Sequence, residues 1–356
     1  MESNVVKIYG KKQLDIREDN KSAVINVLLQ QESTLPQIAE KLGLSLTALA
    51  KVMKELQQKE VVRIVKEETV AYGRPPRVYG INGDCAIACA AVITEQTVVV
   101  YYVDMRGFQI NETSFANDFG SLPDLINCVV KKLKDMKKHP RLQGNALKYL
   151  YVGIPSVGLF GAGFCENRLA IEECAAAGDR GVKVIVRRNV DLEMIAEQEY
   201  GFLKRGAGIA LINLDDCADI ALKLGGKLYY GLEDGHGVWP GYDGFERLCE
   251  SYGAETGGDF FADYVSNRTE AERFAENVFF PIFGELGKVF FFLGVEEVRI
   301  SGAAKRLGEA FLSLARRAFK KDFRVGYTRL GKDVPAALSG AVWLSTYSTL
   351  QDKMAR

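Results

Sequence analysis

The stretch from Ser33 to Pro76 constrains the fold more than any other part of the chain. Its first apolar residues recur three or four positions apart, as on one face of a short helix: Leu35, Ile38, Ala39 and Leu42. Gly43 then predicts a tight turn, and Ser45 is a favourable N-cap for a following helix. Helix, glycine turn and capped helix in this order predict a helix-turn-helix unit.

The second helix of this unit is predicted from Leu46 to Gln57. Its apolar residues again share one face: Leu49, Val52, Met53 and Leu56. An earlier helix, Lys21 to Gln31, and two strands, Val61 to Val65 and Glu68 to Tyr72, would complete a winged helix, with the connection between the strands as the wing. Residues 1–72 are therefore predicted to bind DNA, the alternative being a winged helix used for protein contacts.

The outer face of the second helix supplies the predicted DNA contacts. Thr47 and Lys51 are expected to reach phosphates and base edges, and Lys54 to contact the DNA backbone. Ser45 is expected to contact a phosphate or to cap its helix. The helix carries no arginine, so no guanine contact is predicted.

A stiff segment follows the winged helix. Residues 73–80 begin with Gly-Arg-Pro-Pro and predict an extended linker. Arg74 in this linker is expected to enter an A·T-rich minor groove, and a rigid hinge between domains is an equal and compatible interpretation.

Composition limits the remaining possibilities. The 356 residues are 47% hydrophobic, and 46 basic residues balance 46 acidic ones, so any affinity for DNA must come from a local surface. The polar segment 1–12 is unlike a signal peptide, and no apolar run approaches the roughly 20 residues of a membrane span. The seven cysteines lack Cys-x-x-Cys spacing. We expect a cytoplasmic protein without membrane contact, metal or cofactor.

Beyond Pro76 strands and helices alternate, which predicts an α/β body in two halves. The predicted first lobe, 81–186, holds a hairpin (Cys85 to Ile93 and Thr97 to Val103), a helix (Leu122 to Met136) and strands Lys148 to Ile154 and Lys183 to Val186. The predicted second lobe, 187–356, holds helices Leu192 to Phe202, Ala271 to Leu293 and Ala336 to Thr346 and strands Gly208 to Leu214, Ile220 to Leu224 and Val298 to Ile300. The simplest arrangement is two lobes facing a cleft.

With these motifs the chain resembles the transcriptional repressors of the ROK family, which also contains sugar kinases. The resemblance rests on short motifs in a matching order: Gly73-Arg74-Pro75-Pro76, Val103-Asp104-Met105-Arg106-Gly107, Gly153-Ile154-Pro155, Leu232-Glu233-Asp234-Gly235-His236, Glu250-Ser251-Tyr252, Ile300-Ser301-Gly302-Ala303 and Ala337-Leu338-Ser339-Gly340-Ala341. It implies an actin-like ATPase fold of two α/β lobes behind the winged helix, with a sugar held between the lobes.

The phosphate-binding loops that this resemblance implies are altered. Val92 and Thr94 stand where the kinases have Asp-x-Gly, and Asp215 to Asp219 replaces a glycine-rich loop. Acidic side chains there would repel a triphosphate, so we expect no kinase activity. Divalent-metal binding by Asp215, Asp216 and Asp219 is a minor alternative to a solvated acidic turn.

The family's catalytic Glu-Asn-Asp motif meets Arg188-Asn189-Val190-Asp191, in which Asn189 or Asp191 can be in register, but not both. Asp191 either keeps a role as a base or caps the N-terminus of a helix that begins there. The resemblance assigns sugar contacts to Glu233, His236 and Glu250. In the family three cysteines share a zinc with this histidine; here the stretch that follows it contains only Cys249, which aligns beside a family cysteine position and not on it, so no zinc is expected.

Together these features predict a homodimeric or larger repressor of sugar-related genes, which binds a double-stranded operator and a sugar or sugar-phosphate effector held by Asn189, Asp191, Glu233, His236 and Glu250. Two alternatives remain: an ATP-dependent sugar kinase that retains a DNA-binding domain, and a regulator whose body binds no ligand and serves as a dimerisation scaffold.

Overall fold

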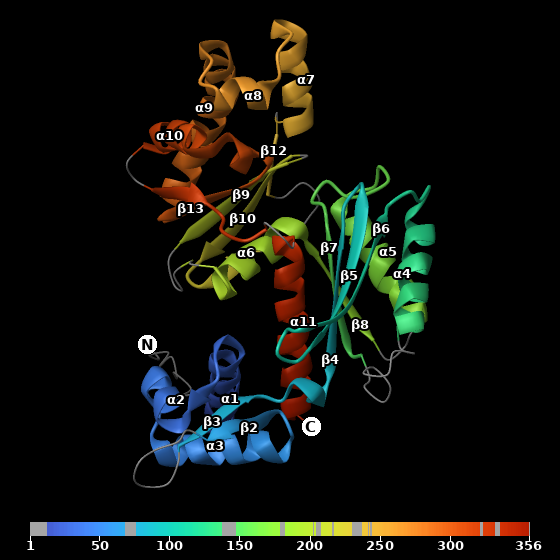
Figure 1. The fold of residues 1–356 in the computed structure, drawn as a ribbon, viewed down its shortest axis with the longest axis vertical. Helices are drawn as coiled ribbons and strands as arrows, with labels where there is room; N and C mark the ends of the chain where they lie inside the picture. The colour runs from blue at the N-terminus through green and yellow to red at the C-terminus, as the bar shows by residue number, and fades with distance from the viewer. Residues whose placement is uncertain are drawn as a thin grey trace, which may run out of the picture.

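In the computed structural model, two mixed sheets with the same topology form the body of the protein (Figure 1). Each begins with an antiparallel meander and continues with two parallel strands, in the orders β6-β5-β4-β7-β8 and β11-β10-β9-β13-β14. The structure describes residues 13–67, 76–136, 147–178, 182–201, 203, 208–215, 217–229, 237–240, 242, 244–320, 323–331 and 335–355. The repeated topology confirms the predicted α/β body with two lobes.

The first lobe is built on the first of these sheets. Its strands are β4 (Ile87–Ile93), β5 (Thr97–Asp104), β6 (Gln109–Ala116), β7 (Tyr149–Ile154) and β8 (Lys183–Arg188). Its helices are α4 (Leu122–Met136) and α5 (Phe164–Gly178). Leu125 and Val129 of α4 and Ile171 of α5 pack in one apolar cluster with alternate residues of β4 and β5. This alternation buries one face of the sheet beneath the two helices.

The second lobe is larger and rich in aromatic residues. Its strands are β9 (Ile209–Leu214), β10 (Ala218–Leu224), β11 (Lys227–Tyr229), β12 (Val238–Trp239), β13 (Glu297–Gly302) and β14 (Arg324–Tyr327). Its helices are α7 (Phe245–Thr256), α8 (Phe260–Val265), α9 (Thr269–Phe292) and α10 (Gly308–Phe319), with a 3₁₀ helix, η3 (Ala303–Leu307), after β13. Buried aromatic rings pack α9 against α10. The ring centroids of Phe279 and Phe311 are 4.8 Å apart, and those of Phe283 and Phe319 are 5.0 Å apart.

The last helix of each lobe packs on the sheet of the other lobe. Helix α6 (Asn189–Glu199) follows β8, but its Val190 and Met194 pack against β9 and β10. Helix α11 (Ala336–Ala355) follows β14, but its Leu338 and Ala341 pack with residues of β4. The predicted division into 81–186 and 187–356 therefore separates α11 from the sheet that it covers. Helix α11 also continues nine residues past the predicted end at Thr346, because its buried face extends to Met354.

The winged helix at the N-terminus contains three helices and a small sheet. The helices are α1 (Gln13–Gln30), α2 (Leu35–Leu42) and α3 (Leu46–Gln58), and the sheet has the order β1 (Ser33–Thr34), β3 (Arg77–Ile81), β2 (Val62–Glu67). Strand β3, not the predicted Glu68 to Tyr72, is the partner of β2. The segment 68–75, with the predicted strand and Arg74, lies outside the described residues.

Pairing of β3 with β2 moves the end of the winged helix beyond the predicted linker at 73–80. The strand forms directly after Pro76, and the next four of its residues after Arg77 are buried. Prolines lack a backbone donor but do not prevent a strand from starting immediately after them. The connection between the winged helix and the first lobe therefore falls after Ile81.

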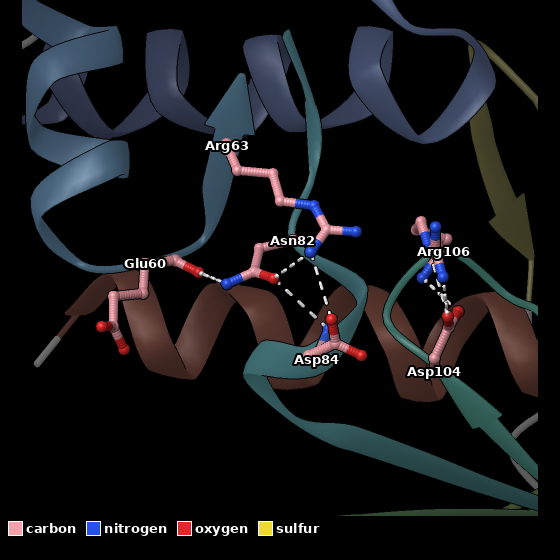
Figure 2. Close-up of polar contacts among 6 residues, drawn as sticks. All are labelled: Glu60, Arg63, Asn82, Asp84, Asp104 and Arg106. Carbon is pink, nitrogen blue, oxygen red and sulfur yellow. Dashed lines mark hydrogen bonds and ion pairs between the residues drawn. The ribbon is translucent and has the colours of Figure 1, made fainter. Parts of the chain in front are cut away.

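Polar contacts hold this connection in place (Figure 2). The Asn82 side chain donates to the carbonyl of Glu60 at 2.9 Å, and its backbone N–H donates to the carbonyl of Val61 at 2.9 Å. Arg63 reaches Asp84 at 3.1 Å. These bonds link the end of α3 and the start of β2 to the turn that leads into β4.

None of the helices in the described parts of the chain is long and apolar enough to cross a membrane.

Candidate DNA-binding surface and interlobe cleft

Helix α3 has one buried and one exposed face. The buried residues are those expected from the sequence: Leu49, Val52, Met53 and Leu56. Ser45 is the N-cap, and its hydroxyl oxygen accepts the N–H of Ala48 at 3.2 Å, as one of its two expected roles requires. Gly43 ends α2 in the left-handed region, with φ of 65°, which a glycine adopts without strain.

The exposed face brings together the residues predicted to contact DNA. A shallow surface is lined by Leu46, Thr47, Ala50, Lys51 and Lys54. All five side chains are exposed, and no ion pair joins Lys51 or Lys54 to another described residue. This surface offers two cationic groups and a hydroxyl on the outside of a rigidly packed helix, which suits contact with a phosphate backbone.

A cleft of about 460 Å³ lies between the two lobes. Residues of both sheets and of both crossing helices line it: Val92, Thr94, Asn189, Glu193, Asn213, Asp215, Gly302, Lys305, Arg306, Leu330, Gly331, Pro335, Ala336 and Ala337. The cleft thus includes the two positions where the resemblance implied phosphate loops, Thr94 and Asp215.

The acidic residues after β9 have separate partners. The Asp215 carboxylate accepts the N–H of Ala303 at 2.7 Å, at the start of η3. Asp219 accepts the hydroxyl of Ser156 and lies 3.3 Å from the Arg188 guanidinium. Asp216 lies outside the described residues. Among the described residues there is no group of three His, Cys, Asp or Glu side chains that could hold a metal ion.

Asn189 and Asp191 lie in the first turn of α6 but have different surroundings. Asn189 lines the cleft, and its side-chain nitrogen donates to the carbonyl of Ile93 at 3.2 Å. Its side-chain oxygen is buried without a hydrogen-bond partner among the described residues. A Cβ atom at Gly153 would lie 2.4 Å from that oxygen, so the glycine of the Gly-Ile-Pro motif makes room for the amide.

Asp191 is 2% exposed and paired with Arg188 through two hydrogen bonds of 2.6 and 2.9 Å. Burial raises the pKa of Asp191, and the Arg188 guanidinium opposes that rise. The helix begins at Asn189 with Arg188 as its N-cap, so the predicted start and capping role of Asp191 are both wrong. Asp191 is not among the residues that line the cleft.

Glu193 is a cleft residue that the sequence reasoning missed. Its carboxylate accepts the hydroxyl of Ser301 at 2.9 Å and the side-chain amide of Asn213 at 3.4 Å. Burial raises the pKa of Glu193 to about 7, although these hydrogen bonds oppose the rise. Its position four residues after Asn189 was the available signal, because i and i+4 share one helix face.

The remaining predicted effector residues do not join this group. Glu250 is exposed on α7 and is not among the residues that line the cleft. Glu233 and His236 lie outside the described residues. In the described part of the chain, only Asn189 of the five predicted effector residues lines the cleft directly.

Comparison with solved structures shows which fold this is. A ROK family transcriptional regulator, described as a homologue of the E. coli MLC protein, matches 95% of this chain and 99% of its own, with 13% identity and a TM-score of 0.73. The chain has the fold of a ROK regulator. A ROK family glucokinase from Streptomyces griseus, in complex with glucose and AMPPNP, matches 73% of this chain and 99% of its own at 12% identity, with a TM-score of 0.55.

A putative N-acetylmannosamine kinase from Listeria monocytogenes likewise covers 73% of this chain and 98% of its own, with 16% identity and a TM-score of 0.58. The regulator therefore aligns with nearly the whole chain, and the two kinases with about three quarters of it. No family model and no curated protein sequence matches the chain.

Several motifs behind the ROK resemblance occupy demanding positions in this fold. Asp104 accepts the N–H groups of Arg106 and Phe108 at 2.8 and 3.0 Å and so closes the hairpin turn between β5 and β6. Gly302 has φ of 79°, and a Cβ atom there would lie 2.8 Å from Asp215. A Cβ atom at Gly340 would lie 1.9 Å from the carbonyl oxygen of Leu192, where α11 crosses α6. These motifs report the geometry of the ROK fold more than a particular chemistry.

Proposed function

We propose that this protein is a DNA-binding transcriptional regulator that represses sugar-related genes. The observation that carries the proposal is the exposed face of α3, with Ser45 at its N-cap and Thr47, Lys51 and Lys54 outward on a helix whose other face is buried. Thr47 and Lys51 contact phosphates and base edges, and Lys54 contacts the backbone further along. Arg74, which lies outside the described residues, is proposed to contact an A·T-rich minor groove from the Gly-Arg-Pro-Pro segment.

The body of the protein is proposed to bind an effector and not to transfer phosphate. Support comes from the two loops that would hold ATP. The first has Val92 and Thr94 where the kinases have the aspartate and glycine of Asp-x-Gly. The second places the Asp215 carboxylate at the N-terminus of η3. A negative charge at that position repels a triphosphate. Asp191, the candidate for a catalytic base, is held by Arg188.

The proposed effector is a sugar or sugar derivative in the interlobe cleft. The buried, unpartnered oxygen of Asn189 would accept a hydroxyl hydrogen, and a sugar offers many such donors. Glu233 and His236 are proposed to add contacts, and Asp191 and Glu250 to join only in a different lobe arrangement. Such a ligand shifts the equilibrium between lobe arrangements only if it binds one arrangement more tightly than the other. In a dimer, the change in lobe arrangement would alter how the two winged helices fit the paired half-sites of the operator.

The DNA-binding proposal is tested by selecting duplexes from a randomised pool with the purified protein and measuring their affinity. Thr47→Ala combined with Lys51→Ala is expected to abolish specific binding while the melting temperature stays nearly unchanged, because both side chains are exposed. Lys288→Ala on α9 is the matched control, since Lys288 is also an exposed helical lysine. Unimpaired binding by the double variant would sink the proposed surface.

The effector proposal is tested by a thermal-shift screen with sugars and sugar phosphates, and with ATP and magnesium in parallel. A ligand that binds the folded state raises the melting temperature. A sugar response that Asn189→Ala removes, without an ATP response, supports the effector. An ATP response would instead favour the kinase alternative, and silence throughout would favour the scaffold.

A further inference from the structure

The centre of the exposed surface on α3 is apolar. Leu46, the first residue of the helix, is 55% exposed, and it lies with Ala50 and Thr47 in the surface that Lys51 and Lys54 border. Leu49, three residues further along the helix, is fully buried, whereas the Leu46 side chain remains in solvent.

Apart from Lys51 and Lys54, this surface lacks the side chains that read bases through hydrogen bonds. Lysine recognises guanine, as arginine does, but the asparagine or glutamine that recognises adenine and the carboxylate that accepts from cytosine are absent from this surface. The two glutamines of α3, Gln57 and Gln58, lie at its far end, while base contacts come from the N-terminal turns of a recognition helix. Glu55 faces the other way and pairs with Arg17 and Lys21.

We infer that Leu46, with Ala50 and the methyl group of Thr47, recognises thymine methyl groups in the major groove. The C5-methyl of thymine is the base feature that apolar side chains complement. Lys51 and Lys54 supply charge complementarity beside it, by contacting the phosphates that flank the groove. The inference rests on the proposed DNA-binding function and names the base that this surface selects.

The test uses the duplex that the full-length protein selects from a randomised pool. Each thymine is replaced in turn by uracil, which removes the methyl group and leaves the base pairing unchanged. At one or two positions in each half-site, replacing thymine by uracil is expected to raise the dissociation constant about fourfold for each methyl group that the protein buries. Leu46→Ala is expected to bind the thymine and uracil duplexes equally, at the weaker affinity.

Two controls make the result specific. Leu169→Ala removes a leucine of similar exposure, 51%, on α5, and is expected to keep the full preference for thymine. Lys54→Ala is expected to weaken both duplexes by the same factor. Equal binding of both duplexes by the unmodified protein overturns the inference and leaves the DNA-binding function intact. Failure to enrich any duplex overturns both.

Discussion

Glu193 is the cleft side chain whose chemistry departs most from its behaviour in water. It lies on α6, is 8% exposed, and has two hydrogen-bond donors, Ser301 and Asn213, for its carboxylate. Burial nevertheless dominates and raises its pKa to about 7, and the carboxylates of Asp215 and Glu197 add to the rise. Its proton is therefore exchanged near neutral pH at the floor of the proposed effector site.

The raised pKa predicts a loss of stability with rising pH. The unfolded chain releases the Glu193 proton near the ordinary glutamate pKa of 4.5, whereas the folded protein keeps it until about 7. The contribution of this group is complete below pH 4.5 and is lost as the pH rises through 7. Urea unfolding of the unmodified protein and of Glu193→Gln is expected to show free energies of unfolding that diverge between pH 4.5 and about 7, with the variant favoured at the higher pH. Parallel profiles would contradict the assignment.

At the scale of elements, local patterns in the sequence predicted much and long-range contacts little. Helix α4 has the bounds that the spacing of its apolar residues predicted. The hairpin of β4 and β5 was predicted from two runs of residues that favour strands. Strand β6 is largely polar and α5 has weak periodicity, so both were missed. The pairing of β3 with β2 and the exchange of α6 and α11 between lobes depend on residues far apart in sequence, which no local pattern reveals.

The crossing of α6 and α11 predicts a strict requirement for glycine at position 340. A Cβ atom there would overlap the carbonyl oxygen of Leu192, and backbone on both sides resists displacement. Gly340→Ala is expected to lower the free energy of unfolding by about 1–3 kcal/mol. Gly284→Ala on α9 is the control, because a Cβ atom at Gly284 would meet nothing within 4 Å and alanine favours a helix. Urea unfolding compares the two, and equal stability of both variants would contradict a close crossing.

At the scale of the whole molecule, α11 connects the cleft with the winged helix (Figure 1). Its first turn, Ala336 and Ala337, lines the cleft, and its 20 residues extend about 30 Å. Near its other end Gln351 donates to the hydroxyl of Ser22 at 3.0 Å, and Lys59 donates to the carbonyl of Met354. One apolar cluster joins the winged helix, β4 and α11. Helix α11 therefore contacts the cleft at one end and the winged helix at the other.

This connection predicts that Met354 supports the winged helix from outside it. Met354 is 3% exposed within the shared cluster, so Met354→Ala is expected to cost about 2–5 kcal/mol and to speed hydrogen exchange in α1 to α3. Met194→Ala is the matched control: Met194 is fully buried on α6 but packs in a cluster of α6 with β9 and β10, so its loss is expected to leave exchange in the winged helix unchanged. Mass spectrometry of exchanged peptides measures both. If the two variants loosen the winged helix equally, or neither does, α11 is not the element that joins it to the cleft, and the connection at Asn82 is the remaining contact between the winged helix and the body.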